Sequence, residues 1–198
     1  MSERKMIYLC LAHMSEEGVE QKYVKEAFDT NWVVPMGPNV NAFEQDLANM
    51  TNSKTDGSEP LDRKVVCLSA GTAAVHLALI ACGVKAGDEV LVQSFTFCAS
   101  SHPITYLGAK PVFVGSERDT WNMDPVLLEQ AILDRKEKTG RYPKAIVPVA
   151  LYGMPYDCER IMAIADKYGI PVIEDAAEGM GSRFNGQVLG RRFEVGRR

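Results

Sequence analysis

The chain has 198 residues, 46% of them hydrophobic, and a formal net charge of −4 at pH 7, values that are ordinary for one globular domain. The acidic balance argues against a nucleic-acid partner, because a nucleic-acid surface needs a basic face. The N-terminal stretch MIYLCLAHM is too short to span a membrane and lacks the layout of a signal peptide. We therefore expect a cytoplasmic protein with no membrane partner.

Two helices are predicted before the first strand. Residues 16–30 carry apolar side chains at helical spacing, and Asn39 can cap a second helix. Residues 51–64 are polar and hold several turn residues, which predicts a surface insertion. The sequence thus divides into an N-terminal helical segment over residues 1–50, the insertion, and a main domain over residues 65–190.

Strands and helices alternate through the main domain. Buried strands are predicted over 64–70, 89–94, 110–115, 144–151 and 170–174. Helices are predicted over 71–83 and 98–108, from an Asp124 cap to about Lys138, and from an Asp157 cap to Gly169. This alternation predicts an α/β fold in which a mostly parallel sheet is covered by helices on both faces, giving three α/β/α layers.

The cysteines are scattered and include no CxxC pair; they are Cys10, Cys67, Cys82, Cys98 and Cys158. Four of the five lie in apolar stretches. We interpret them as small buried hydrophobic residues of a protein in a reducing compartment.

Ligands of open parallel sheets bind at the carboxyl ends of the strands, so the residues just after each strand are the candidate site. Gly71 and Thr72 follow the first strand and open a helix, whose free N–H groups suit a phosphate; the alternative is an ordinary tight turn. Phe97 follows the second strand and could stack on a planar ring; the alternative is a core phenylalanine.

Asp175 ends the last strand in the run IPVIEDAAEG. A Mg²⁺ role beside a nucleotide needs a P-loop, which the sequence lacks, and the three histidines show no metal-ligand spacing. A carboxylate can also keep a pyridine nitrogen protonated, which makes the ring an electron sink, as in pyridoxal phosphate chemistry. The remaining alternative is a helix cap or a structural ion pair. A phosphate cradle, an aromatic residue and a strand-end acid together fit one phosphorylated pyridine ring.

Long segments around these residues resemble the DegT/DnrJ/EryC1/StrS family of sugar aminotransferases, which have the fold type I architecture. The matching segments include SAGTAAVHLALIACGVKAGDEVLVQSFTFCAS and PVALYGMPYDCERIMAIADKYGIPVIEDAAEGMGSRFNGQVLG, and the resemblance spans about residues 6–190. It implies a pyridoxal 5′-phosphate enzyme, a homodimer when intact, that moves an amino group from glutamate to a keto-sugar nucleotide for cell-surface or secondary-metabolite sugars.

Carried over by position, the resemblance implies five cofactor contacts and one weaker substrate candidate. Gly71 and Thr72 would bind the phosphate, Phe97 would stack on the ring and Asp175 would pair with the ring nitrogen. Glu178 stands where the family places a residue near the ring hydroxyl. Trp32, in the segment Trp32–Pro35–Gly37, resembles a residue near the active site; the alternative is a loop that packs on the dimer partner. No metal is implied.

The sequence departs from the family pattern at its end. The family's Schiff-base lysine follows the strand-end acid in a segment resembling SFxxxK, whereas the last lysine here is Lys167, so no catalytic lysine is assigned. The segment 191–198, RRFEVGRR, matches nothing expected, and the small C-terminal domain is absent. We interpret the chain as the N-terminal part of a large domain, truncated, with weak or no cofactor binding and no transaminase activity alone.

Two other functions stay open at this stage. One is a sugar dehydratase of the same superfamily, in which histidine replaces the lysine at a position that this sequence does not contain. The other is a non-catalytic half-domain that pairs with a full-length relative, which the two-fold symmetric dimers of such enzymes would allow.

Overall fold

The computed structural model describes residues 6, 14–52 and 63–190 and divides the chain into two compact units, residues 1–46 and 47–198. The first unit contains α1 (Val19–Asp29) and the start of α2 (Pro38–Asn52). Neither helix has a fully buried residue. The predicted Asn39 cap is wrong, because the helix already begins at Pro38, whose fixed φ suits a first helical turn. Of the predicted insertion, residues 53–62 lie outside the described residues.

The second unit is built on a parallel sheet with the strand order β2-β1-β3. The strands are β1 (Glu89–Gln93), β2 (Lys110–Val114) and β3 (Ala145–Val147). The predicted strand 170–174 is present only as a segment with two isolated parallel bridges beside β3, from Ile146 to Val172 and from Val149 to Asp175. The ladder between these two segments is interrupted at Pro148, which has no N–H to donate, and β3 is therefore shorter than the predicted 144–151.

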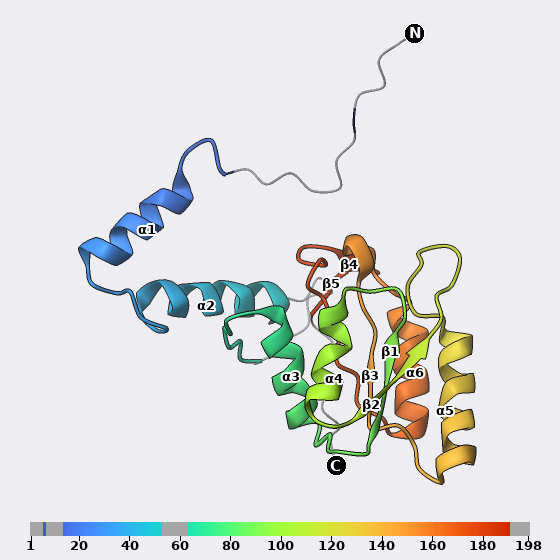
Figure 1. Cartoon of the computed structure of the whole chain (residues 1–198). Coiled ribbons are helices and arrows are strands. Elements are labelled where there is room, and N and C mark those ends of the chain that lie inside the picture. The colour runs from blue at the N-terminus through green and yellow to red at the C-terminus, as the bar shows by residue number, and fades with distance from the viewer. Residues whose placement is uncertain (1–5, 7–13, 53–62, 191–198) are drawn as a thin grey trace. The chain divides into compact units, whose positions relative to one another are not determined.

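Helices cover both faces of this sheet (Figure 1). One face packs against α3 (Gly71–Ala81) and α4 (His102–Tyr106), and the other against α5 (Pro125–Thr139) and α6 (Cys158–Tyr168). Side chains alternate along β1: Val90 and Val92 enter the core under α3 and α4, whereas Leu91 enters the core under α5 and α6. The predicted three-layer α/β/α fold is confirmed. No helix among the described residues is long and apolar enough to cross a membrane.

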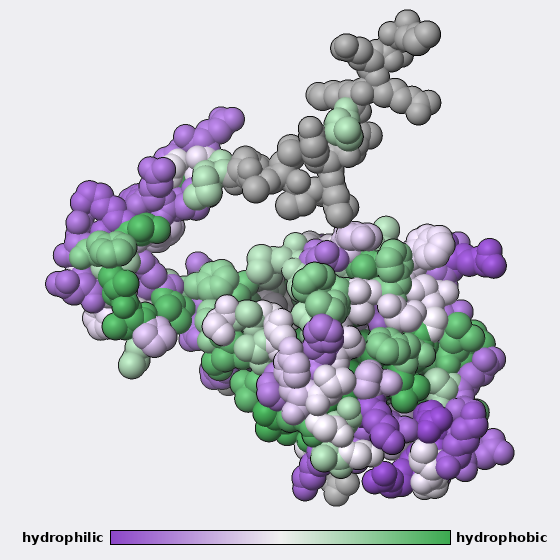
Figure 2. Space-filling view, viewed as in Figure 1, coloured by the Kyte–Doolittle hydropathy of each residue, from purple (hydrophilic) through white to green (hydrophobic). Residues whose placement is uncertain are grey.

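The predicted strand over residues 64–70 is wrong, because this segment has no regular secondary structure. A strand needs a hydrogen-bonded neighbour, and no strand in the described part of the chain pairs with it. Val66 is 70% exposed and Leu68 41% exposed, and on α3 both Leu77 and Ile80 are 50% exposed. Figure 2 shows hydrophobic side chains at the surface over α3. The sheet as described therefore leaves an apolar surface beside α3 uncovered.

Two predicted caps are confirmed, and they fix where α5 and α6 begin. The Asp124 carboxylate accepts from the N–H groups of Val126 at 2.7 Å and Leu127 at 3.4 Å. The Asp157 carboxylate accepts from the N–H of Arg160 at 3.1 Å. Both helices also end at a glycine in the left-handed conformation, Gly140 and Gly169.

Removing the cap of α5 gives a direct stability prediction. Asp124→Ala leaves the first N–H groups of the helix without their acceptor and should lower the free energy of unfolding by about 1 kcal/mol. Urea unfolding followed by circular dichroism measures the change. Gln130→Ala, at an exposed position of the same helix, is the control and should change stability by less than about 0.5 kcal/mol. Equal effects of the two substitutions would contradict the capping role.

Candidate functional site

Asp175 lies at the carboxyl edge of the sheet, at the end of the segment 170–175 that pairs with β3. Its Oδ2 atom accepts a hydrogen bond from Ser100 Oγ at 2.6 Å, and its Oδ1 atom accepts from the backbone N–H of Ala177 at 3.2 Å. Its own backbone N–H and carbonyl are used by the sheet, bonding Pro148 and Ala150. The carboxylate is half-buried and held at both oxygens, so it is a fixed acceptor at the sheet edge.

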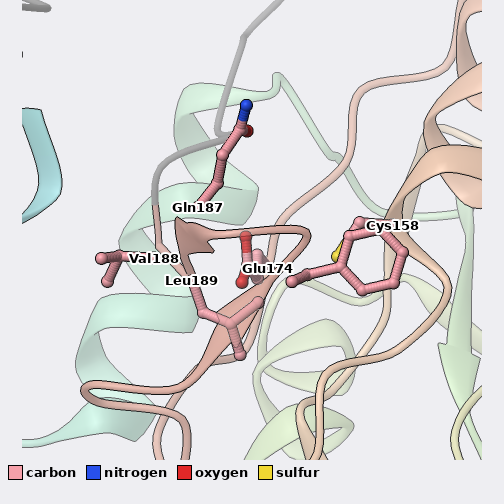
Figure 3. Close-up of a pocket in the computed structure, with 6 residues that line it drawn as sticks. Cys158, Glu174, Gln187, Val188 and Leu189 are labelled. Atoms are coloured by element: carbon pink, nitrogen blue, oxygen red, sulfur yellow. The ribbon is translucent and has the colours of Figure 1, made fainter. Parts of the chain in front are cut away.

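The neighbouring acid, Glu174, serves the opposite face of the sheet. Successive side chains of a strand alternate, and Glu174 Oε1 accepts from the N–H of Gly190 at 3.0 Å, just after the hairpin of β4 (Arg183–Phe184) and β5 (Gln187–Val188). Figure 3 shows the residues that line a small pocket there, which are Cys158, Glu174, Phe184, Gln187, Val188 and Leu189. The hairpin contact makes Glu174 a structural residue and leaves Asp175 as the candidate for chemistry.

A short helix, η1 (Cys98–Ser100), connects three of the predicted site elements. Phe97 is its N-cap residue, Ser100 is its last residue and contacts Asp175, and the helix itself packs against α3 and α4. Phe97 is 77% exposed, so it is not a core phenylalanine. Its ring is free to lie against a ligand.

Gly71 and Thr72 are the first two residues of α3, which has no side-chain cap. Their N–H groups precede the first intrahelical bonds and have no intrahelical acceptor. A Cβ atom built on Gly71 would meet no described atom within 4 Å beyond its chain neighbours and the backbone of its own helix, so the backbone is open to close approach. The prediction of an anion cradle fits these features.

Glu178 is exposed, and its Oε2 atom accepts from the backbone N–H of Tyr152 at 2.5 Å. Tyr152 has a φ of 51°, a left-handed conformation that is rare for a bulky residue. The same turn is tied down at Gly153, whose carbonyl accepts from Ser182 Oγ at 2.6 Å. Residues 178–182 therefore pack along the turn after β3, and the Glu178 carboxylate is held beside the peptide of Tyr152.

Two fully buried amides were missed by the sequence analysis. Gln93 ends β1, where its Oε1 atom accepts from the N–H groups of Met123 at 2.8 Å and Val149 at 3.3 Å. Its Nε2 atom donates to the Phe95 carbonyl at 2.9 Å and lies 3.4 Å from Asn122 Oδ1. The sequence signal that could have identified Gln93 is its place as a polar residue at the end of the apolar run EVLVQ.

Asn122 continues this network into the turn after β3. Its Oδ1 atom accepts from the N–H of Leu151 at 3.1 Å, and its Nδ2 atom donates to the carbonyl of Met154 at 2.9 Å. The two amides thus join the loops that follow β1, β2 and β3. These loops present three partly exposed aromatic rings, Phe95, Trp121 and Tyr152, with Phe95 at edge-on angles to the other two.

Trp32 belongs to the first unit and is 49% exposed. Gly37 has a φ of 134°, and a Cβ atom there would lie 2.9 Å from Trp32 Cε3. The indole therefore lies directly on Gly37, which explains why the segment needs glycine. The predicted role of Trp32 toward substrate stays a prediction.

The cysteines differ in exposure, which partly corrects the expectation that they are buried. Cys82 and Cys158 are buried, Cys67 is half-buried and Cys98 is exposed at the start of η1; Cys10 lies outside the described residues. The helical turn that carries Phe97 to the surface also carries Cys98 there. Among the described residues, no three His, Cys, Asp or Glu side chains gather to hold a metal ion.

This difference predicts the order of thiol modification. Iodoacetamide should alkylate Cys98 in the folded chain at least tenfold faster than Cys82, where burial raises the pKa of the thiol and blocks access. Mass spectrometry of tryptic peptides over time measures both rates. Addition of urea should equalise them, and equal rates without urea would contradict the placement of η1.

Comparison with known proteins agrees with this architecture. The sequence profile of the DegT/DnrJ/EryC1/StrS aminotransferase family matches residues 14–196. The chain belongs to this family. EpsN of Bacillus subtilis (strain 168), provisionally described as a pyridoxal phosphate-dependent aminotransferase, is 47% identical over 186 residues, which cover 94% of this chain and 45% of EpsN. GDP-perosamine synthase of Escherichia coli O157:H7 is 37% identical over 93% of this chain and 46% of its own length.

Solved structures of the family share the fold. NtdA from Bacillus subtilis, with the bound cofactor PMP, superposes with a TM-score of 0.72 at 31% identity over 85% of this chain and 35% of NtdA. The fold is that of the fold type I sugar aminotransferases. The chain spans about half the length of the curated relatives it matches.

Lys167 lies near the end of α6, as predicted. Its Nζ atom is 2.7 Å from Glu129 Oε1 on α5. Because α6 leads into the start of the strand that ends at Asp175, its last turn lies at the amino edge of the sheet. Lys167 is therefore a structural ion-pair residue at the edge opposite the candidate site.

Proposed function

We propose that this chain provides the cofactor-binding face of a pyridoxal phosphate-dependent sugar aminotransferase. The N–H groups at Gly71 and Thr72 would hold the phosphate, Phe97 would cover the ring, Asp175 would accept from the ring nitrogen and Glu178 would lie near the ring hydroxyl. The observation that supports this most is the Asp175 carboxylate, fixed by Ser100 and Ala177 at the carboxyl edge of the sheet.

The residues present fit such a group on chemical grounds. Both Asp175 oxygens already accept hydrogen bonds, so the carboxylate is matched to a ligand that donates an N–H rather than to another acceptor. The start of α3 supplies positive N–H groups for a phosphate dianion. When bound, a protonated pyridine ring acts as an electron sink for a carbanion. This chain's residues would bind the ring, keep its proton in place and exclude water from its covered face.

The names of relatives support a proposal for the substrates. GDP-perosamine synthase and UDP-2-acetamido-2-deoxy-3-oxo-D-glucuronate aminotransferase, from Pseudomonas aeruginosa and 42% identical over 154 residues, are named for nucleotide-linked sugars. We propose that the amino acceptor is a keto-sugar nucleotide, that glutamate is the donor, and that the intact enzyme is a cytoplasmic homodimer. The 198-residue chain alone should give no turnover, because Lys167 is held at the opposite sheet edge.

The test uses PMP (pyridoxamine phosphate), which needs no covalent bond to a lysine. Fluorescence titration of the 198-residue chain should show weak, saturable binding of PMP. Pyridoxamine without the phosphate should bind at least tenfold more weakly, and inorganic phosphate should compete. Equal binding of the phosphorylated and unphosphorylated amines would contradict the cradle at Gly71 and Thr72, and absence of PMP binding would contradict the proposed function.

A further inference from the structure

Asp175 receives a buried hydrogen bond from a residue 75 positions earlier in the chain. Ser100 is 1% exposed, and its Oγ atom lies 2.6 Å from Asp175 Oδ2. A second hydroxyl, Thr96 Oγ1, lies 2.8 Å from Ser100 Oγ. The three side chains form one line from the loop after β1 to the end of the last strand.

The direction of each bond in this line is fixed by chemistry. A serine hydroxyl has one proton, and an ionised carboxylate can only accept. Ser100 therefore donates to Asp175, and Thr96 must donate to Ser100. The N–H of Ala177 donates to the other carboxylate oxygen at 3.2 Å. The carboxylate is thus held in one orientation, with its free lone pairs left for a donor outside the protein.

We propose that Ser100 is a positioning residue for Asp175, oriented in turn by Thr96, and that the line selects a ligand ring whose nitrogen carries a proton. The inference rests on the proposed function. A carboxylate that the protein already holds in one orientation loses no further rotational freedom when the ligand binds. Its remaining lone pair points toward the ligand before binding. Without Ser100 the carboxylate could rotate and would bind a ring N–H less well.

The neighbouring serine offers a matched control. Ser101 is one position along the same turn, and its hydroxyl donates only to the local carbonyl of Cys98 at 3.2 Å. Ser100→Ala should raise the dissociation constant of PMP about tenfold, the size expected for one hydrogen bond to a charged group. Ser101→Ala should leave it unchanged, Ser100→Thr should restore most of the affinity, and Thr96→Val should raise the constant roughly threefold.

A second ligand separates positioning from a merely structural role. The analogue of PMP in which a C–H group replaces the ring nitrogen cannot donate to Asp175. Ser100→Ala should weaken the binding of PMP while leaving the affinity for this analogue unchanged, so the ratio of the analogue's dissociation constant to that of PMP falls about tenfold. Circular dichroism confirms that each variant is folded. If Ser100→Ala does not fold, the ratio is measured on Thr96→Val, where it should fall roughly threefold.

Each outcome either supports or overturns the positioning role of Ser100. A fall in the ratio for Ser100→Ala but not for Ser101→Ala supports positioning. Equal weakening of both ligands, or equal constants for Ser100→Ala and Ser101→Ala, would overturn it while leaving the proposed function in place. Failure of the unsubstituted chain to bind PMP would overturn the proposed function and this inference together. This outcome can be told apart from the others because it is seen before any substitution is made.

Discussion

Asp175→Asn is expected to raise the dissociation constant of PMP by roughly 10- to 100-fold. The asparagine keeps the shape of the side chain but loses the negative charge, and a hydrogen bond to a charged group contributes about 1.5–3 kcal/mol. Ser100 and Ala177 donate to different oxygens of the carboxylate. An asparagine side chain has only one oxygen, so it cannot keep both hydrogen bonds and also loses its fixed orientation. Fluorescence titration with PMP measures the constant.

The control for this prediction is Asp166→Asn. Asp166 is exposed on α6, next to Lys167, so the substitution removes the same charge at the amino edge of the sheet. Its effect on PMP affinity should be less than about twofold, because exposed charges separated by more than a Debye length are largely screened. Equal effects of the two substitutions would mean that Asp175 contributes only net charge and does not contact the ring.

Asn122→Ala should lower the free energy of unfolding by about 3 kcal/mol. The Asn122 side chain is fully buried and bonds the Leu151 N–H and the Met154 carbonyl. Its loss leaves the buried Leu151 N–H without a partner, which costs about 1–3 kcal/mol, and also removes the part-buried hydrogen bond to the Met154 carbonyl. Urea unfolding measures the change.

Asn41→Ala is the matched control for this substitution. Asn41 is exposed on α2, and the change there should stay within about 0.5 kcal/mol. Asn122→Ala should also free the turn at Tyr152, so chymotrypsin should cut residues 150–154 faster in this variant than in the control. A stability loss below about 1 kcal/mol would contradict the stabilising role of the buried hydrogen-bond network of Gln93 and Asn122.

Much of the fold could be predicted because local signals decide it. Alternating apolar strands and capped helices identify β1, β2, α5 and α6, and the Asp124 and Asp157 caps act within three residues of themselves. The segment 64–70 could not be predicted in this way. Its apolar residues favour a strand, yet a strand forms only beside a partner, and partners are set by the tertiary structure rather than by local sequence.

The candidate site also contains residues that local sequence identifies and residues that only the tertiary structure identifies. Phe97 and Asp175 could be proposed because each follows a segment that pairs in the sheet, whereas Gly71 follows a segment that is not a strand and was proposed from the helix that it begins and from the resemblance to a family. Ser100 was not, since a serine in the run CASSHP differs in nothing local from Ser101, and only the fold brings it to Asp175. Gln93 and Asn122 are 29 residues apart, and their mutual burial depends on how the loops after β1 and β2 meet.

The most direct test of the central claim is the protonation state of a bound ring nitrogen. PMP labelled with ¹⁵N in the ring is added to the 198-residue chain, at a pH high enough that free PMP has lost its ring proton. The bound form should give the nitrogen resonance of a protonated pyridinium, and this resonance should be lost in Asp175→Asn. A bound ligand whose nitrogen resonates as neutral pyridine would contradict the claim that Asp175 accepts from the ring.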